Sequence, residues 1–291
     1  MLSFINAKIN IGLYVTGLLP NGYHTLSTIF YPIGTANGTP ANPEPFCDIL
    51  EIVPNGKEEP EFYFSGNRID CPPEKNLVAK SHNAFRSAIR DKGLPYIPCD
   101  IILQKAIPDG AGIGGGSADA AFTLRMLDSI HGNPLSRCEL IALASAIGAD
   151  VPFFIINQPS CAEGTGDILS PSTLSLKGYW IALVKNKESV STAEAYRGVK
   201  ISSAPEGYPD IASLPVKEWR GRIENMFEES VFARLPETGM LKQRLYDCGA
   251  EYASMSGSGS AVFGIFSSRE KACNALDNTN AAYKALILCE R

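Results

Sequence analysis

Five glycines fall within the seven positions from 110 to 116, between a predicted strand over 99–107 and a predicted helix over 117–131. Glycine tolerates positive φ angles and lets the backbone approach a ligand closely. The first amides of a helix have no partner within the helix, and its dipole adds positive potential there. The pattern therefore predicts a site for an anion such as phosphate. Ser117 follows the glycines, where its hydroxyl would cap the helix or reach a phosphate or Mg²⁺.

Two common phosphate-binding loops do not fit this segment. Gly110-x-Gly112-x-x-Gly115 matches a dinucleotide-binding turn, but the second strand and its acidic end are missing, since the chain near Asp128 is still in the predicted helix. A P-loop requires a lysine before its Ser or Thr, and Ser117 follows glycine. The alternative is that the segment is only a flexible connection. Its position directly before a helix argues against that alternative. Ser256-Gly-Ser-Gly259 is a second small-residue loop, either a tight turn or a closure over the first loop.

Two charged residues are candidates for acid–base and electrostatic work. Residues 5–15 alternate between apolar and polar side chains, which predicts a half-buried strand. Lys8 and Asn10 lie on its polar face, where Lys8 is either a surface lysine or a cation in a cleft. Asp150 follows a predicted helix end and precedes Val-Pro, on what we expect to be an exposed loop. It is either a turn residue or a carboxylate that accepts a proton.

The other patterns predict an α+β chain of two lobes, residues 1–155 and 156–291. In the first lobe, strands are predicted over 25–33, 47–53 and 61–65, helices over 76–92 and 137–147, and a loop over 34–46. Ser136 and Glu139 form a capping box before the second of these helices. In the second lobe, strands are predicted over 160–163, 179–185 and 261–266, and helices over 223–234, 237–248 and from 268.

Composition narrows the class of protein. The chain has 291 residues, 45% of them hydrophobic, and a formal charge of −5, which excludes a disordered chain and disfavours a nucleic-acid binder. Eight cysteines and three histidines show no metal-ligand spacing, so we expect mostly buried, reduced cysteines and no protein-built metal site. His82 and His131 are read as structural. No signal peptide and no membrane-spanning run are apparent, so we expect a soluble cytoplasmic protein.

Three segments, taken in this order, resemble the motifs of the GHMP-type small-molecule kinases: residues 6–17, 108–121 and 253–259. Residues 21–26 and 148–153 bring the resemblance close to a kinase of isoprenoid biosynthesis that acts on a cytidine diphosphate polyol. The resemblance implies two α+β lobes with the active site in the cleft between them. It implies ATP as phosphoryl donor, Mg²⁺ and a small-molecule acceptor. It implies no nucleic-acid or membrane partner, and a protein that is a monomer or a homodimer.

The resemblance also implies roles for individual residues. Lys8 and Asp150 match the catalytic lysine and aspartate. Asn10, Tyr23, His24 and Tyr196 match acceptor-binding positions, the three aromatic rings against the cytosine. The positions of the ATP-binding loop are matched by Pro108, Asp109, Gly110, Ala111, Gly112, Ile113, Gly114, Gly115, Gly116, Ser117 and Ala118.

Two alternatives stay open. The first is another kinase of this family, acting on mevalonate, homoserine or a sugar, which would not need the Tyr23-His24 pair. The second is a nucleotide-binding module without catalytic activity, against which the joint presence of Lys8, Asp150 and the glycine-rich loop argues. The chain departs from the family pattern in having Asn21 where Asp is usual and Ala118 where a second Ser is common.

Overall fold

The computed structural model describes residues 1–34, 45–57, 59–67, 72 and 75–290. Contacts among them divide the chain into two compact units. The first contains Met1–Ala7, Cys47–Asp109 and Gly114–Asn157, and the second contains Lys8–Phe46, Gly110–Ile113 and Gln158–Arg291. The chain therefore leaves the first unit at Lys8 and again, briefly, within the glycine-rich loop. Each unit combines a sheet with helices, so the α+β class is confirmed.

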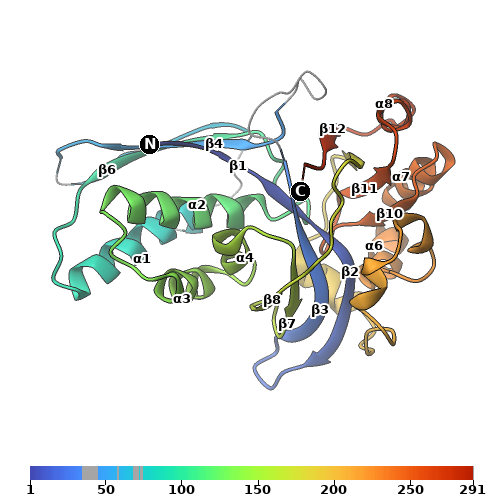
Figure 1. The fold of residues 1–291 in the computed structure, drawn as a ribbon, viewed down its shortest axis with the longest axis horizontal. Helices are drawn as coiled ribbons and strands as arrows, with labels where there is room; N and C mark the ends of the chain where they lie inside the picture. Colours follow the sequence, from blue (N-terminus) through green and yellow to red (C-terminus); the bar gives the residue numbers. More distant parts are fainter. Residues whose placement is uncertain (35–44, 58, 68–71, 73–74, 291) are drawn as a thin grey trace. The chain divides into compact units, whose positions relative to one another are not determined.

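The first unit is a four-stranded sheet with helices on one face (Figure 1). Its strand order is β1-β4-β6-β5. The β1–β4 and β4–β6 pairs are antiparallel, and the β5–β6 pair is parallel. The apolar stripe of α1, with Val78, Phe85 and Ile89, is buried as its 3.6-residue spacing predicts. The elements are β1 (Leu2–Ile5), β4 (Asp48–Pro54), β5 (Phe62–Gly66), β6 (Cys99–Lys105), α1 (Leu77–Asp91), α2 (Gly115–Ile130), α3 (Arg137–Ile147) and α4 (Val151–Ile156).

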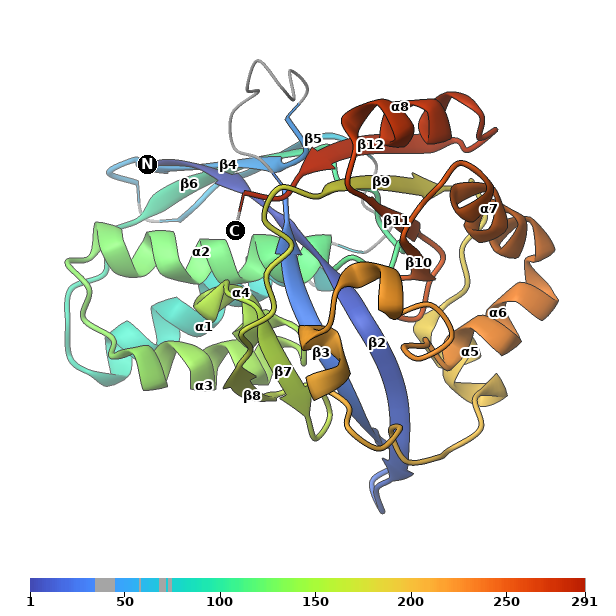
Figure 2. The ribbon, with the colours of Figure 1, turned by 45° about the vertical axis from the view of Figure 1, so that its right-hand side comes forward.

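The second unit contains two four-stranded sheets. The first has the order β2-β3-β7-β8 and the second the order β10-β11-β9-β12. Figure 2 shows the long strands β2 and β3 side by side, and β12 next to β9. The elements are β2 (Ala7–Leu18), β3 (His24–Ile33), β7 (Ser160–Glu163), β8 (Ile168–Pro171), β9 (Trp180–Lys185), β10 (Tyr252–Met255), β11 (Val262–Phe266), β12 (Tyr283–Leu288), α5 (Thr192–Gly198), α6 (Phe227–Arg234), α7 (Pro236–Asp247), α8 (Arg269–Asp277) and two 3-10 turns, Asp210–Ser213 and Val216–Glu218.

The strand predicted over 5–15 is real, but two expectations about it are wrong. It is interrupted at Asn6, whose side-chain amide exchanges hydrogen bonds of 3.0 and 2.8 Å with that of Asn157. Both of its faces are buried, since Lys8, Asn10 and Tyr14 are 3%, 1% and 3% exposed. The polar side of the alternation is therefore buried and does not face water.

Several local predictions can be compared directly with the structure. The capping box at Ser136 and Glu139 is confirmed, with both reciprocal hydrogen bonds present. The chain after Asp150 is a short helix, α4, which was not predicted from the sequence pattern. The strand β12 was not predicted either. Of the seven described cysteines only Cys47, Cys99 and Cys289 are buried, so the expectation of mostly buried thiols is wrong. Most of the predicted 34–46 loop (35–44), and Cys71, lie outside the described residues.

The two remaining histidines make structural contacts, as predicted. His82 is buried, shares a hydrogen bond with the hydroxyl of Tyr96, and has its pKa lowered by burial. His131 ends α2, where its Nδ1 is 2.7 Å from the carbonyl of Leu127 and its Nε2 accepts the amide of Ile97. Among the described residues no helix has the length and apolar character needed to span a bilayer.

Candidate active site

The glycine-rich loop adopts the backbone that its composition predicts. Gly110, Gly112 and Gly114 have φ angles of 60°, 72° and 73°, a region that side chains with a Cβ rarely occupy. Gly114 in this left-handed conformation is the residue before α2, so the helix begins at Gly115 rather than at 117. Ser117 therefore lies inside the first turn, and its predicted role as helix cap is wrong. Its second predicted role, toward a phosphate or Mg²⁺, stays a prediction.

The start of α2 has the properties of an anion site. The helix has 16 residues, so the first of its amides lack helical partners and its dipole directs positive potential to this end. Gly116 is exposed in the first turn, and the nearest atom to a Cβ placed there is Leu77 Cδ1 at 3.8 Å. Gly116 therefore leaves this end of the helix open to solvent, as a bound phosphate requires.

The second small-residue loop packs directly on the first, within the second unit. The Ser256 hydroxyl donates to the carbonyl of Gly112 over 2.9 Å, and the Ala261 amide donates to the carbonyl of Ala111 over 3.1 Å. A Cβ on Gly112 would overlap the Ser256 carbonyl oxygen and lie 3.0 Å from the Gly259 nitrogen. The expectation that Ser256–Gly259 closes over the first loop is confirmed for residues 111 and 112.

Lys8 and Asn10 belong to the same arrangement. The Lys8 amide donates to the carbonyl of Ile113 over 2.9 Å, so β2 is bonded to the glycine-rich loop. The Lys8 ammonium donates to Asn10 Oδ1 over 2.6 Å and lies 4.7 Å from the centre of the Phe30 ring. The backbone amide of Asn10 donates to Ser256 Oγ over 3.3 Å. A buried cation is thus fixed on a strand that contacts both small-residue loops, and the surface-lysine alternative is excluded.

The structure brings two of the three predicted aromatic residues together. The rings of His24 and Tyr196 are stacked, with centroids 4.6 Å apart and planes inclined by 26°. Tyr196 is also held edge-on by Phe227 at 4.8 Å. Tyr23 is 66% exposed on the turn before β3. His24 and Tyr196 are rings of the kind on which a base stacks, and the sides that face one another are covered by their own stacking.

Asp150 occupies the N-cap position of α4, half-buried, with Pro152 in the first turn. The expectation of an exposed loop there is wrong, because Val151 to Ile155 are buried as a helix. Asp150 belongs to the first compact unit and Lys8 to the second.

Sequence reasoning missed a buried charged cluster in the first unit, made of Asp48, Lys105 and Asp119. The Lys105 ammonium bonds to both carboxylates, with a separation of 2.7 Å from Asp119 Oδ2. Asp48 Oδ1 also accepts the amides of Ala106 and Ile107, over 2.6 and 2.8 Å. The cluster thus ties the residues that enter the glycine-rich loop to the helix that leaves it.

Burial and neighbouring charges shift the pKa values of two members of this cluster, Asp119 and Lys105. Desolvation raises the pKa of Asp119 well above its usual range, and Asp48 acts in the same direction. Burial alone would lower the pKa of Lys105, but the two carboxylates outweigh it and raise that pKa. Asp119 Oδ1 is buried without a hydrogen-bond partner among the described residues. One signal was present in the sequence: Asp119 is the only charged residue between positions 110 and 124.

Comparisons with known proteins relate this chain to one family. The sequence profile of the GHMP kinases N terminal domain matches residues 76–158, and that of the GHMP kinases C terminal domain matches residues 216–285. A 4-diphosphocytidyl-2-C-methyl-D-erythritol kinase of Parabacteroides distasonis is 48% identical over 91% of this chain and 92% of its own. The protein of the same name in Bacteroides fragilis is 45% identical, over 93% and 94%.

Solved structures show the same relationship. A crystal structure of 4-(cytidine 5'-diphospho)-2C-methyl-D-erythritol kinase superposes with a TM-score of 0.75 at 30% identity, over 99% of both chains. A homoserine kinase from Cytophaga hutchinsonii superposes with a TM-score of 0.63 at 15% identity, over 98% of this chain and 95% of its own, which shows the fold alone. This chain therefore belongs to the GHMP kinase family.

Proposed function

We propose that this protein transfers the γ-phosphoryl group of ATP to the 2-hydroxyl of 4-diphosphocytidyl-2-C-methyl-D-erythritol, a step of the non-mevalonate isoprenoid route. The relatives at 41–48% identity that bear this kinase's name support the choice of acceptor. One observation carries the reaction class. The buried Lys8 cation lies on a strand bonded to a glycine-rich loop that leads into a helix N-terminus. Phosphoryl transfer depends mainly on such positioning and charge stabilisation.

The proposal assigns a role to each group. The glycine-rich loop and the first amides of α2 hold the phosphates of ATP. Asp150 accepts the proton of the acceptor hydroxyl, and Lys8 stabilises negative charge that develops during transfer. The stacked His24 and Tyr196 rings, with Tyr23, receive the cytosine base, and Asn10 contacts the acceptor.

Mg²⁺ enters this reaction as part of the Mg-ATP substrate. Nowhere in the described residues do three or more His, Cys, Asp or Glu side chains form a group that could hold a metal ion. In a kinase, Mg²⁺ keeps several waters and is bound by the phosphates and only one or two protein groups. The Ser117 hydroxyl in the first turn of α2 is one such group.

Three further expectations belong to the proposal. Residues 1–155 and 156–291 correspond to the two family domains, with the profile matches at 76–158 and 216–285 in support. The enzyme acts in the cytoplasm. It is a monomer or a homodimer, which light scattering during size-exclusion chromatography decides.

The deciding experiment is an ADP-release assay with Mg-ATP and a panel of acceptors. The panel contains 4-diphosphocytidyl-2-C-methyl-D-erythritol, the same polyol without the cytidylyl group, mevalonate, homoserine and galactose. We expect turnover with the first alone. Turnover with another acceptor would retain the kinase assignment but refute the roles of Tyr23, His24 and Tyr196. No turnover with any acceptor would refute the proposed acceptor.

The variant Asp150→Ala tests the proposed mechanism in the same assay. We expect a loss of about 100-fold or more in turnover, a typical value for a removed general base. Nucleotide affinity, measured by calorimetry, should persist. Loss of ATP binding by a folded Asp150→Ala protein would contradict the assignment, and ADP release that survives Asp150→Asn unchanged would indicate a module without this chemistry.

A further inference from the structure

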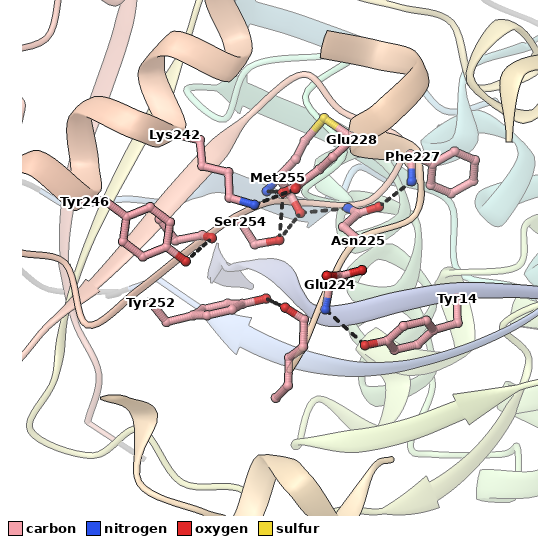
Figure 3. Close-up of polar contacts among 12 residues, drawn as sticks. Tyr14, Glu224, Asn225, Phe227, Glu228, Lys242, Tyr246, Tyr252, Ser254 and Met255 are labelled. Carbon is pink, nitrogen blue, oxygen red and sulfur yellow. Dashed lines mark hydrogen bonds and ion pairs between the residues drawn. The ribbon is translucent and has the colours of Figure 1, made fainter. Parts of the chain in front are cut away.

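The loop that packs on Gly112 is bound by side chains from outside it, in addition to its own turn hydrogen bond from the Gly259 amide to the Ser256 carbonyl. Ser256–Gly259 is a turn of small residues with φ angles of 56° and 89° at Gly257 and Gly259. The side chains that fix it come from a segment about 30 residues earlier, at the start of α6. Figure 3 shows these contacts, in which Asn225 and Glu228 both reach the backbone around Met255.

Asn225 uses its whole side-chain amide in this contact. It is 3% exposed, and its Nδ2 donates to the carbonyls of Met255 and Gly257 over 2.8 and 2.9 Å. These carbonyls flank Ser256, the residue whose hydroxyl bonds to Gly112. Asn225 Oδ1 accepts the amide of Phe227 over 3.0 Å, which ties the same side chain to the first turn of α6.

Glu228 holds the preceding residues of β10 from the first turn of α6. Its Oε1 accepts the amide of Met255 over 2.8 Å and the hydroxyl of Ser254 over 3.1 Å. Its Oε2 bonds to Lys242 of α7, in an ion pair whose side chains are 12% and 24% exposed. Ser254, Met255 and Gly257 are therefore bound by two side chains, on both sides of Ser256.

The segment that carries Asn225 is itself bonded to β2. The Leu13 amide donates to the carbonyl of Glu224, and the Met226 amide donates to the carbonyl of Leu13, both over 2.9 Å. β2 also carries Lys8 and Asn10. A continuous set of hydrogen bonds therefore runs from β2 through Asn225 to residues 255–257, and through Ser256 to Gly112.

We infer that Asn225 and Glu228 are positioning residues for nucleotide binding, which act by holding residues 254–257 so that Ser256 fixes Gly112. The inference rests on the proposed function, because it takes the glycine-rich loop to be the phosphate site. Neither residue touches substrate in this scheme. Each acts through the backbone of the second loop.

The variant Asn225→Asp separates this role from a merely structural one. An aspartate oxygen still accepts the Phe227 amide at the start of α6, so the helix end is preserved. It cannot donate to the carbonyls of Met255 and Gly257, and it places a carboxylate against them. We expect the Kd for ADP, measured by calorimetry without acceptor, to rise at least tenfold. KM for ATP should rise with it, and KM for the acceptor should stay within twofold.

Glu228 provides a second pair of variants and α6 provides the control. Glu228→Gln keeps an oxygen for the Met255 amide and should keep the Kd for ADP within about threefold of the unchanged protein. Glu228→Ala removes that oxygen and should raise the Kd at least tenfold. The matched control is Glu229→Gln on the same helix, whose carboxylate pairs with Lys200 at the surface. It should leave the Kd unchanged.

The outcomes decide between the two roles. A lower Tm for Asn225→Asp together with a Kd within twofold of the unchanged protein would overturn the inference, because the residue would then only stabilise the fold. If Asn225→Asp does not fold, equal Kd values for Glu228→Ala and Glu228→Gln would overturn it instead. If the unchanged protein binds neither ADP nor ATP, the proposed function itself fails, which is a different result from unchanged binding in the variants.

Discussion

The contact between the two small-residue loops predicts a specific cost for Gly112→Ala. Gly112 has a φ of 72°, and a Cβ there would overlap the Ser256 carbonyl oxygen and lie 3.0 and 3.1 Å from Gly259 backbone atoms. All three atoms belong to backbone, so the overlap is not relieved by a side-chain rotation. Either the second loop moves or the first one does.

The magnitude follows from three contributions. A left-handed conformation costs a residue with a Cβ about 1–2 kcal/mol. Overpacking against backbone costs about 1–3 kcal/mol, and the lost Ser256–Gly112 hydrogen bond costs about 1 kcal/mol. We therefore expect the free energy of unfolding to fall by about 3–6 kcal/mol. Urea denaturation at equilibrium, with an unchanged m-value, measures this difference.

Gly110→Ala is the matched control. Gly110 has a φ of 60°, but a Cβ there meets only Ser189, with Oγ at 3.4 Å and Cβ at 3.6 Å. This variant should lose only the conformational contribution of about 1–2 kcal/mol. The difference between the two variants therefore isolates the packing of the second loop on Gly112. Equal stability and equal affinity for ADP in both variants would refute the reasoning.

Three further predictions follow from single residues. Gly116→Ala lies at an exposed helical position with no close neighbour and should raise the free energy of unfolding, measured in urea, by about 0.5–1 kcal/mol. The same variant should weaken ADP binding measured by calorimetry, and unchanged ADP binding would contradict the role of this helix end. Because the pKa of Asp119 is raised above 3.8, the stability that its protonated form contributes is fully present below pH 3.8 and is lost as the pH rises through the raised value. The unfolding free energy of Asp119→Asn minus that of the unchanged protein, measured in urea, should therefore increase as the pH rises above 3.8. A difference that does not change with pH would refute this. Lys8→Met should keep the Tm within a few degrees while lowering turnover at least 100-fold. A large fall in Tm with turnover retained in the folded fraction would contradict a catalytic role.

The fold and the site were predictable from sequence to different degrees. The strands and the main helices follow from periodicity, and the capping box at Ser136 and the turn at Gly114 follow from residue types that act over three or four positions. β12 was not predictable in this way, because its evidence is the antiparallel pairing of Tyr283–Leu288 with β9, about 100 residues earlier. The same holds for the burial of both faces of β2.

The sequence by itself determined where chemistry is placed along the chain: the glycine-rich loop, Lys8 and Asn10 two positions apart, and a second loop of small residues. Only the tertiary structure decided what holds them. The Lys105 cluster joins residues 57 and 14 positions apart, and Asn225 reaches carbonyls about 30 residues away. The physical reason is that conformational preferences act between near neighbours in the chain, whereas a buried charge or amide is satisfied by whichever partner the packed fold brings within hydrogen-bond distance.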